Sequence, residues 1–92
     1  MLLKQFQPIM INLSYIINVP GSGGGSIRQV EAEGGIYHAT NTVDPNVYFL
    51  YDPFMDVFYW YDYFTQIPGE PVSQEELNNY VLEEADPENI DI

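Results

Sequence analysis

The sequence predicts an α+β fold, in which a small antiparallel β-sheet of four to five strands, meander-like in order, carries one C-terminal helix packed on it. Three observations predict this fold. Apolar and polar residues alternate over 9–19, two Asp-Pro turns bracket aromatic runs of strand length, and a helix-capping motif precedes an apolar stripe near the C-terminus. The length of 92 residues allows one small domain, which we assign to 1–92.

The first predicted strand covers 9–19, where a period of two and many β-branched residues indicate a half-buried strand. The Pro-Gly-Ser-Gly-Gly-Gly-Ser segment at 20–26 follows, and it is typical of a flexible loop, although engineered linkers have the same composition. The segment lacks the Lys of a phosphate-binding loop and the third Gly of a dinucleotide-binding loop. Two further strands are predicted over 27–33 and 36–43, joined as a hairpin by Gly34-Gly35.

Turns at 44–46 and 52–56 define the next two predicted strands, 47–51 and 57–65. A helix over 53–66 competes with the second hairpin, because Asp52 could cap it and several apolar residues have helical spacing. We favour the hairpin, since aromatic residues and Val prefer a pleated surface.

The two faces of the strand at 57–65 differ in composition. One face presents Phe58, Trp60 and Phe64 with Asp62 among them, and the other presents Val57, Tyr59, Tyr61 and Tyr63. The segment DPNVYFLY followed by DPFMDVFYWYD, within 44–62, resembles the aromatic hairpins of OCRE domains over about a fifth of the chain. It lacks the turn Gly and most of that repeat, so we interpret the resemblance as shared turn chemistry.

The segment 68–71 (Pro-Gly-Glu-Pro) breaks the last strand, and a helix is predicted over 74–85. Ser73 and Glu76 have capping-box spacing, and Val72 and Leu77 have hydrophobic-staple spacing. An apolar stripe with helical spacing follows, formed by Leu77, Tyr80, Val81 and Ala85. Residues 86–92 are expected to fray as an acidic tail.

The formal net charge is −12, and the two basic residues, Lys4 and Arg28, both precede the first of the 14 acidic residues. Direct binding to nucleic acid or to an anionic membrane face is therefore not expected. The sequence has no Cys and one His, His38, so it excludes thiolate zinc sites and thiol nucleophiles. We expect no catalysis, cofactor or metal, since His38 fits an ordinary strand residue and Asp52, Asp56 and Asp62 lack the EF-hand pattern. A soluble cytoplasmic protein is expected, because no signal peptide or membrane span is evident.

Two features favour a protein partner. In the predicted helix, four acidic residues share one exposed quarter, and those near its C-terminus oppose the helix dipole. In the hairpin, ten of the seventeen residues over 48–64 are aromatic, so the Tyr face is a second candidate surface. The predicted partner-binding residues are Glu75, Glu76, Glu83, Asp86, Tyr59, Tyr61, Tyr63 and Asp62.

These features predict a non-enzymatic acidic protein that binds and inhibits a basic nucleic-acid-binding protein as a DNA or RNA mimic. In composition the chain resembles phage-encoded DNA-mimic inhibitors, such as anti-CRISPR, anti-restriction and uracil-DNA-glycosylase inhibitors. That resemblance implies a viral protein that acts on a defence or repair enzyme in the host cytoplasm. The alternative is a small structural, assembly or adaptor protein that self-associates through the aromatic hairpin, for example as a homodimer.

Overall fold

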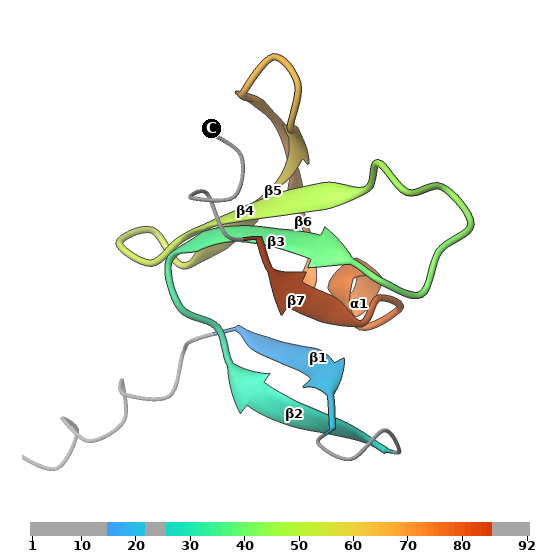
Figure 1. Ribbon diagram of the computed structural model, residues 1–92. Coiled ribbons are helices and arrows are strands. Elements are labelled where there is room, and N and C mark those ends of the chain that lie inside the picture. Colours follow the sequence, from blue (N-terminus) through green and yellow to red (C-terminus); the bar gives the residue numbers. More distant parts are fainter. Residues whose placement is uncertain (1–14, 22–25, 86–92) are drawn as a thin grey trace, which may run out of the picture.

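The computed structural model describes residues 15–21 and 26–85, which form two antiparallel sheets and one short helix (Figure 1). The α+β class is confirmed in this coarse form, but the described chain has seven strands rather than four to five. The larger sheet has the order β6-β5-β4-β3-β7, in which β3 to β6 form the expected meander, and the smaller sheet pairs β1 with β2. The elements are β1 (Ile16–Pro20), β2 (Ile27–Glu31), β3 (Gly35–Ala39), β4 (Tyr48–Asp52), β5 (Val57–Asp62), β6 (Ile67–Val72), α1 (Gln74–Leu77) and β7 (Leu82–Glu84).

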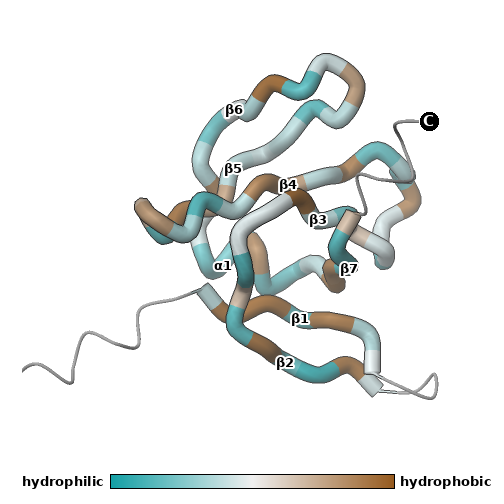
Figure 2. The backbone as a smooth tube through the Cα atoms, turned by 60° about the vertical axis from the view of Figure 1, so that its left-hand side comes forward, coloured by the Kyte–Doolittle hydropathy of each residue, from teal (hydrophilic) through white to brown (hydrophobic). Residues whose placement is uncertain are grey.

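The core lies between the five-stranded sheet and a layer formed by α1 and the β1–β2 hairpin (Figures 1 and 2). Phe49 and Phe58, from the two central strands, are completely buried, and Leu77 brings α1 against them. Every strand of the larger sheet contributes to this core, and β1 contributes from the smaller sheet. The buried residues are Ile17, Tyr37, Ala39, Phe49, Tyr51, Phe58, Val72, Leu77 and Leu82.

The turns after β4 and β5 repeat the same chemistry at an interval of ten residues. The Asp52 Oδ1 atom accepts bonds from the backbone N–H groups of Phe54 and Met55, at 2.9 and 3.4 Å. The Asp62 Oδ1 atom likewise accepts bonds from the backbone N–H groups of Phe64 and Thr65, at 3.0 and 3.2 Å. The last residue of each turn, Asp56 or Gln66, has a positive φ of 59° or 63°. The alternative helix over 53–66 is therefore wrong, and the strand predicted to reach residue 65 ends at Asp62.

The Gly34-Gly35 pair does not form the predicted hairpin. Strand β2 pairs with β1, whereas β3 pairs with β4 and β7, so the two glycines cross from one sheet to the other. Both glycines are nevertheless required, because Gly35 has a φ of 142° and a Cβ on Gly34 would lie 2.9 Å from the Pro53 ring. The predicted strand at 36–43 ends at Ala39.

Three segments predicted from the sequence lie partly or wholly outside the described residues. The described part of the strand predicted over 9–19 begins at Ile16, and residues 9–14 are not described. The centre of the Gly/Ser loop, 22–25, and the acidic tail, 86–92, are also outside the described residues.

The helix predicted over 74–85 is wrong in length, since α1 ends at Leu77. Its start is as predicted: the Ser73 hydroxyl accepts a bond from the Glu76 N–H at 3.1 Å, and Leu77 is buried. After a turn at 78–79, residues 82–84 form β7 on the edge of β3. Pairing with β3 satisfies a row of backbone groups that a longer helix would leave exposed on that edge, so tertiary contact overrides local helix preference. Within the described residues, no helix is long and apolar enough to cross a membrane.

Strand β6 corrects another expectation, because 68–71 does not break the sheet. Pro68 and Pro71 both lie within β6, which is an edge strand with a register shift opposite 59–61. An edge strand tolerates proline, since one side of its backbone makes no ladder bonds.

Asp56 joins three parts of the fold. Its carboxylate accepts bonds from the Tyr51 hydroxyl in β4 and from the Tyr15 N–H ahead of β1, the latter at 3.2 Å. Its backbone N–H donates to the Asp52 carbonyl at 2.8 Å, which closes the β4–β5 turn. The position therefore requires both an acidic acceptor and a residue that tolerates positive φ, and Asp meets both demands.

We expect Asp56→Ala to lower the free energy of unfolding by about 1.5–3 kcal/mol, because two bonds to a charged acceptor are lost. Asp56→Asn retains one acceptor oxygen and tolerance of positive φ, so it should cost less. Urea denaturation followed by circular dichroism measures both values. Equal and small losses, below about 0.5 kcal/mol, would show that this carboxylate does not hold β1 to β4.

Candidate functional site

One face of the five-stranded sheet points away from the core, and we call it the outer face. Its side chains line up in cross-strand rows, because paired residues of antiparallel strands share a face. The Tyr residues on it are half-buried rather than fully covered. One row consists of Glu83, His38, Tyr48, Tyr61 and Pro68, and the next of Ile36, Leu50, Tyr59 and Pro71.

Rings of the first row contact one another and also Tyr63, which follows β5. The ring centroids of His38 and Tyr48 are 4.6 Å apart, and those of Tyr48 and Tyr63 are 4.2 Å apart with an angle of 17° between planes. Tyr61 meets Tyr63 edge to face at 6.4 Å. Stacked rings hold one another in place, so this surface is organised before any partner arrives.

A hydrogen bond gives His38 a structural role. Its Nε2 atom lies 2.8 Å from the Pro45 carbonyl oxygen. A carbonyl only accepts, so Nε2 carries the proton and donates it, which ties the 44–46 turn to β3. The same turn closes on itself, since the Asp44 carboxylate accepts the Asn46 N–H at 2.9 Å.

A pocket of about 520 Å³ opens where the 44–46 turn meets the β5–β6 turn, and we call it the aromatic pocket. Two acidic residues, Asp44 and Asp62, line it together with five aromatic residues. One of these, Trp60, turns its ring to the core face of β5, against Phe49. Its size is within the range of small-ligand pockets. The aromatic lining residues are Tyr48, Trp60, Tyr61, Tyr63 and Phe64.

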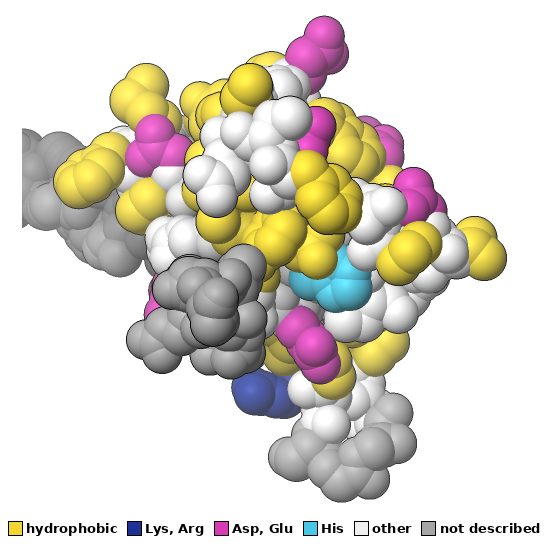
Figure 3. Space-filling model, turned by 45° about the horizontal axis from the view of Figure 1, so that its top comes forward, with side chains coloured by type: hydrophobic (Ala, Val, Ile, Leu, Met, Phe, Trp, Pro, Cys, Tyr) yellow, Lys and Arg dark blue, Asp and Glu magenta, His cyan; other side chains and the backbone are white. Residues whose placement is uncertain are grey.

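Acidic side chains surround the outer face, and no Lys or Arg lines the aromatic pocket among the residues that the structure describes. Figure 3 shows hydrophobic side chains gathered on this side of the molecule, with the His beside them and carboxylates around them. Asp44, Asp62 and Glu83 are exposed. Arg28 is the one Lys or Arg among the residues that the structure describes, and it lies in a different cleft.

The structure brings together one group of the predicted partner-binding residues and separates the others. Tyr59, Tyr61, Tyr63 and Asp62 belong to the outer face or its rim, and Glu83 ends the first row. Glu75 and Glu76 lie on α1, in the layer on the opposite side of the sheet (Figure 1).

The predicted acidic face of a long helix is therefore wrong. Glu83 is in strand β7, and Asp86 lies outside the described residues. The argument from the helix dipole fails with it, because Glu83 and Glu84 are not near a helix end.

Tyr48 and His38 were missed as site residues. The alternation within 47–51 carried a signal, since it places Tyr48 and Leu50 on one face and Phe49 and Tyr51 on the other. What the sequence did not reveal is that β3 would lie beside β4 and bring His38 to Tyr48.

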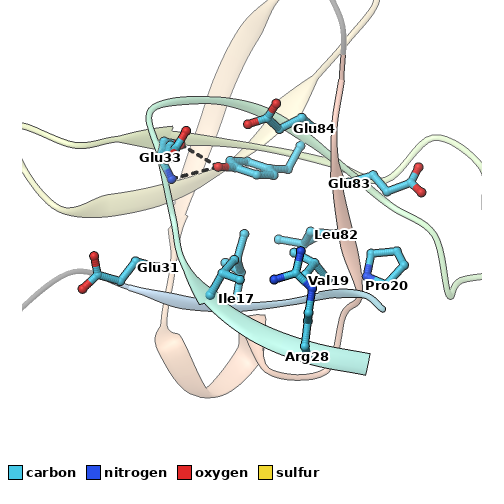
Figure 4. Close-up of a pocket in the computed structure, with 11 residues that line it drawn as sticks. Ile17, Val19, Pro20, Arg28, Glu31, Glu33, Leu82, Glu83 and Glu84 are labelled. Atoms are coloured by element: carbon cyan, nitrogen blue, oxygen red, sulfur yellow. Dashed lines mark hydrogen bonds between the residues drawn. The ribbon is translucent and has the colours of Figure 1, made fainter. Parts of the chain in front are cut away.

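A second cleft, of about 590 Å³, lies between the two sheets, and we call it the intersheet cleft. Figure 4 shows Arg28 reaching into it from β2, with Glu83 and Glu84 opposite on β7. Tyr37 closes one end: its hydroxyl donates to the Glu33 carbonyl at 2.7 Å and accepts from the Glu33 N–H at 2.9 Å.

No group of three or more side chains that could hold a metal ion occurs among residues 15–21 and 26–85. The carboxylates of Asp52 and Asp62 accept backbone N–H groups of the two hairpin turns, and that of Asp56 accepts the Tyr15 N–H and the Tyr51 hydroxyl. Comparisons of the chain with protein-family models, curated proteins and solved structures found no match.

Tyr37 makes stability sensitive to alkaline pH. Burial raises the pKa of its hydroxyl above the ordinary value of 10.0, the bonds to the Glu33 backbone lower it, and the Glu84 charge raises it. The raised pKa means that the fold favours the protonated hydroxyl, so this stabilisation is complete below pH 10 and is lost as the pH rises through the folded-state pKa.

We therefore expect the free energy of unfolding to fall above pH 10, and to fall less steeply in Tyr37→Phe. Urea denaturation of both proteins between pH 8 and 12 measures the slopes. Tyr80, whose pKa is also raised by burial and by Glu76, leaves a residual slope in the variant. Identical slopes would show that Tyr37 does not couple folding to its ionisation.

Proposed function

We propose that this chain is a non-enzymatic inhibitor that docks its outer face on a basic surface of a nucleic-acid-binding protein. The observation that carries the proposal is the aromatic outer face rimmed by carboxylates, with no Lys or Arg among the described residues of the aromatic pocket. It would act in the cytoplasm, as a DNA or RNA mimic of the phage type that blocks a defence or repair enzyme.

The arrangement suits such a role physically. Aromatic residues supply contact area at low entropic cost and form the desolvated centre of tight interfaces. Carboxylates at the rim replace nucleic-acid phosphates, steer a basic partner toward the face and suppress contacts with acidic proteins. Stacking of Tyr48 on Tyr63 lowers the ordering cost of binding.

The charge balance of the fold gives independent support. Eleven of the fourteen acidic residues lie in the described part of the chain, and the other three are Asp86, Glu88 and Asp91. Arg28 is the one basic side chain available to them there, so most of this charge is not neutralised within the described fold. An external cationic surface would neutralise it and gain long-range attraction that salt weakens.

A second candidate function is assembly through self-association. It is favoured by the hairpin tips, where Phe54 is 93% exposed and Phe64 is 75% exposed. Exposed aromatic side chains at both ends of the β4–β5–β6 unit could join copies of the chain as a homodimer or an adaptor.

The inhibitor proposal is tested by affinity capture from host lysate on the immobilised chain at low and high salt, followed by mass spectrometry. Each basic nucleic-acid-binding protein recovered is purified and titrated with the chain, with and without duplex DNA. We expect binding that weakens steeply with salt and that excludes DNA. Recovery of no such protein, or simultaneous binding of chain and DNA, would contradict the proposal.

Variants locate the interface in the same titration. Tyr61→Ala should weaken binding about thirtyfold, as expected of an aromatic side chain at an interface centre. Glu75→Gln, on the opposite side of the sheet, removes one negative charge away from the outer face and should leave affinity unchanged. Circular dichroism checks that both variants are folded. Loss of binding in Glu75→Gln but not in Tyr61→Ala would move the interface to α1.

Sedimentation velocity distinguishes the two candidate functions. Under the inhibitor proposal, we expect a monomer over a wide range of protein and salt concentrations. A concentration-dependent dimer that persists in high salt and is abolished by Phe54→Ser or Phe64→Ser would favour assembly, because apolar contacts are little affected by salt.

A further inference from the structure

We propose that the aromatic pocket binds the guanidinium group of an arginine side chain presented by the partner. This inference rests on the proposed function and specifies the chemical group that the outer face recognises.

The lining attracts a planar cation. Aromatic rings carry negative charge on their faces, and a cation within about 6 Å of a ring centroid is attracted by it. Five of the eleven lining residues are aromatic, and Tyr48 and Tyr63 are already stacked with their rings nearly parallel. A guanidinium group is flat and weakly hydrated, so it stacks on such rings more readily than an ammonium group does.

The two carboxylates in the pocket can each accept a further bond. Oδ1 of Asp44 and Oδ1 of Asp62 accept backbone N–H groups of their own turns. Within the described residues, Oδ2 of each carboxylate accepts no hydrogen bond and Arg28 is not near. Each turn therefore orients a carboxylate in the pocket and leaves one oxygen for a ligand. A guanidinium group, with five N–H donors, can bond to a carboxylate while it stacks.

Charge excludes other ligand classes. An anion would meet Asp44 and Asp62, and no Lys or Arg of the described chain lines the pocket to compensate them. A neutral apolar ligand would gain the aromatic contacts but would strip water from two carboxylates without replacing it. An arginine side chain meets both demands, since its plane contacts the rings and its edge donates to the oxygens.

The test measures peptide binding by isothermal titration calorimetry. The full chain is titrated with three blocked tripeptides, acetyl-Gly-X-Gly-amide, in which X is arginine, lysine or citrulline. Citrulline has nearly the shape of arginine but no charge. We expect the arginine peptide to bind about tenfold more tightly than the citrulline peptide, with lysine between them.

Asp62→Asn is the matched variant, because the amide oxygen still accepts the two turn N–H groups while the charge is lost. It should weaken the arginine peptide about fivefold and leave the citrulline peptide unchanged. Glu75→Gln removes one negative charge, as Asp62→Asn does, but lies outside the pocket, so it should change neither affinity. This pair separates local recognition from general attraction to an acidic protein.

The outcomes separate this inference from the proposed function. Equal affinity for arginine and citrulline, or equal losses in Asp62→Asn and Glu75→Gln, would overturn the guanidinium site even if a basic partner binds elsewhere on the outer face. Selective binding of the arginine peptide, combined with recovery of no nucleic-acid-binding protein from the lysate, would retain the guanidinium site and overturn the inhibitor role.

Discussion

The register between β4 and β5 is the constraint on which the rest of the structure depends. It pairs Phe49 with Trp60 and Tyr51 with Phe58 on one face, and Tyr48 with Tyr61 on the other. A slip of one residue would exchange these sets and bury the tyrosines in place of the core. The Asp52 turn fixes the register, because its side-chain bonds and the positive φ of Asp56 allow one way of closing the hairpin. Core and outer face are thus set together by a five-residue turn.

The sequence was most informative where local chemistry decides the structure. Asp-Pro turns, the strand alternation around them and the Ser73 cap could all be predicted, because each depends on residues close in the chain. The Tyr face could be predicted for the same reason. Prediction failed at sheet edges: nothing local shows that β2 pairs with β1 rather than β3, or that His38 lies beside Tyr48.

The segment 81–84 shows how a strong local signal can mislead. Val81 continues the helical spacing that starts at Leu77, yet it forms an isolated bridge with Asn18 and leads into strand β7. Asn41 helps to decide this outcome, because its side chain accepts the Val81 N–H at 2.9 Å and donates to the Asn79 carbonyl at 3.1 Å. A residue some forty positions away thus supplies the bonds that a helix would have made internally. The strand also moves Glu83 from a helix surface to the row that contains His38.

The two prolines in β6 affect how another chain can pair with this edge of the larger sheet. Pro68 and Pro71 have no N–H, so the outermost strand of the larger sheet lacks donors at both positions. A foreign strand that tried to extend the sheet there would find an incomplete ladder, as is common in proteins that resist edge-to-edge aggregation. Contact on that side therefore relies more on side chains, which differ between partners, than on the backbone. Because strand pairing at β6 is disfavoured, the tyrosine side chains of the outer face have more influence on which partner binds.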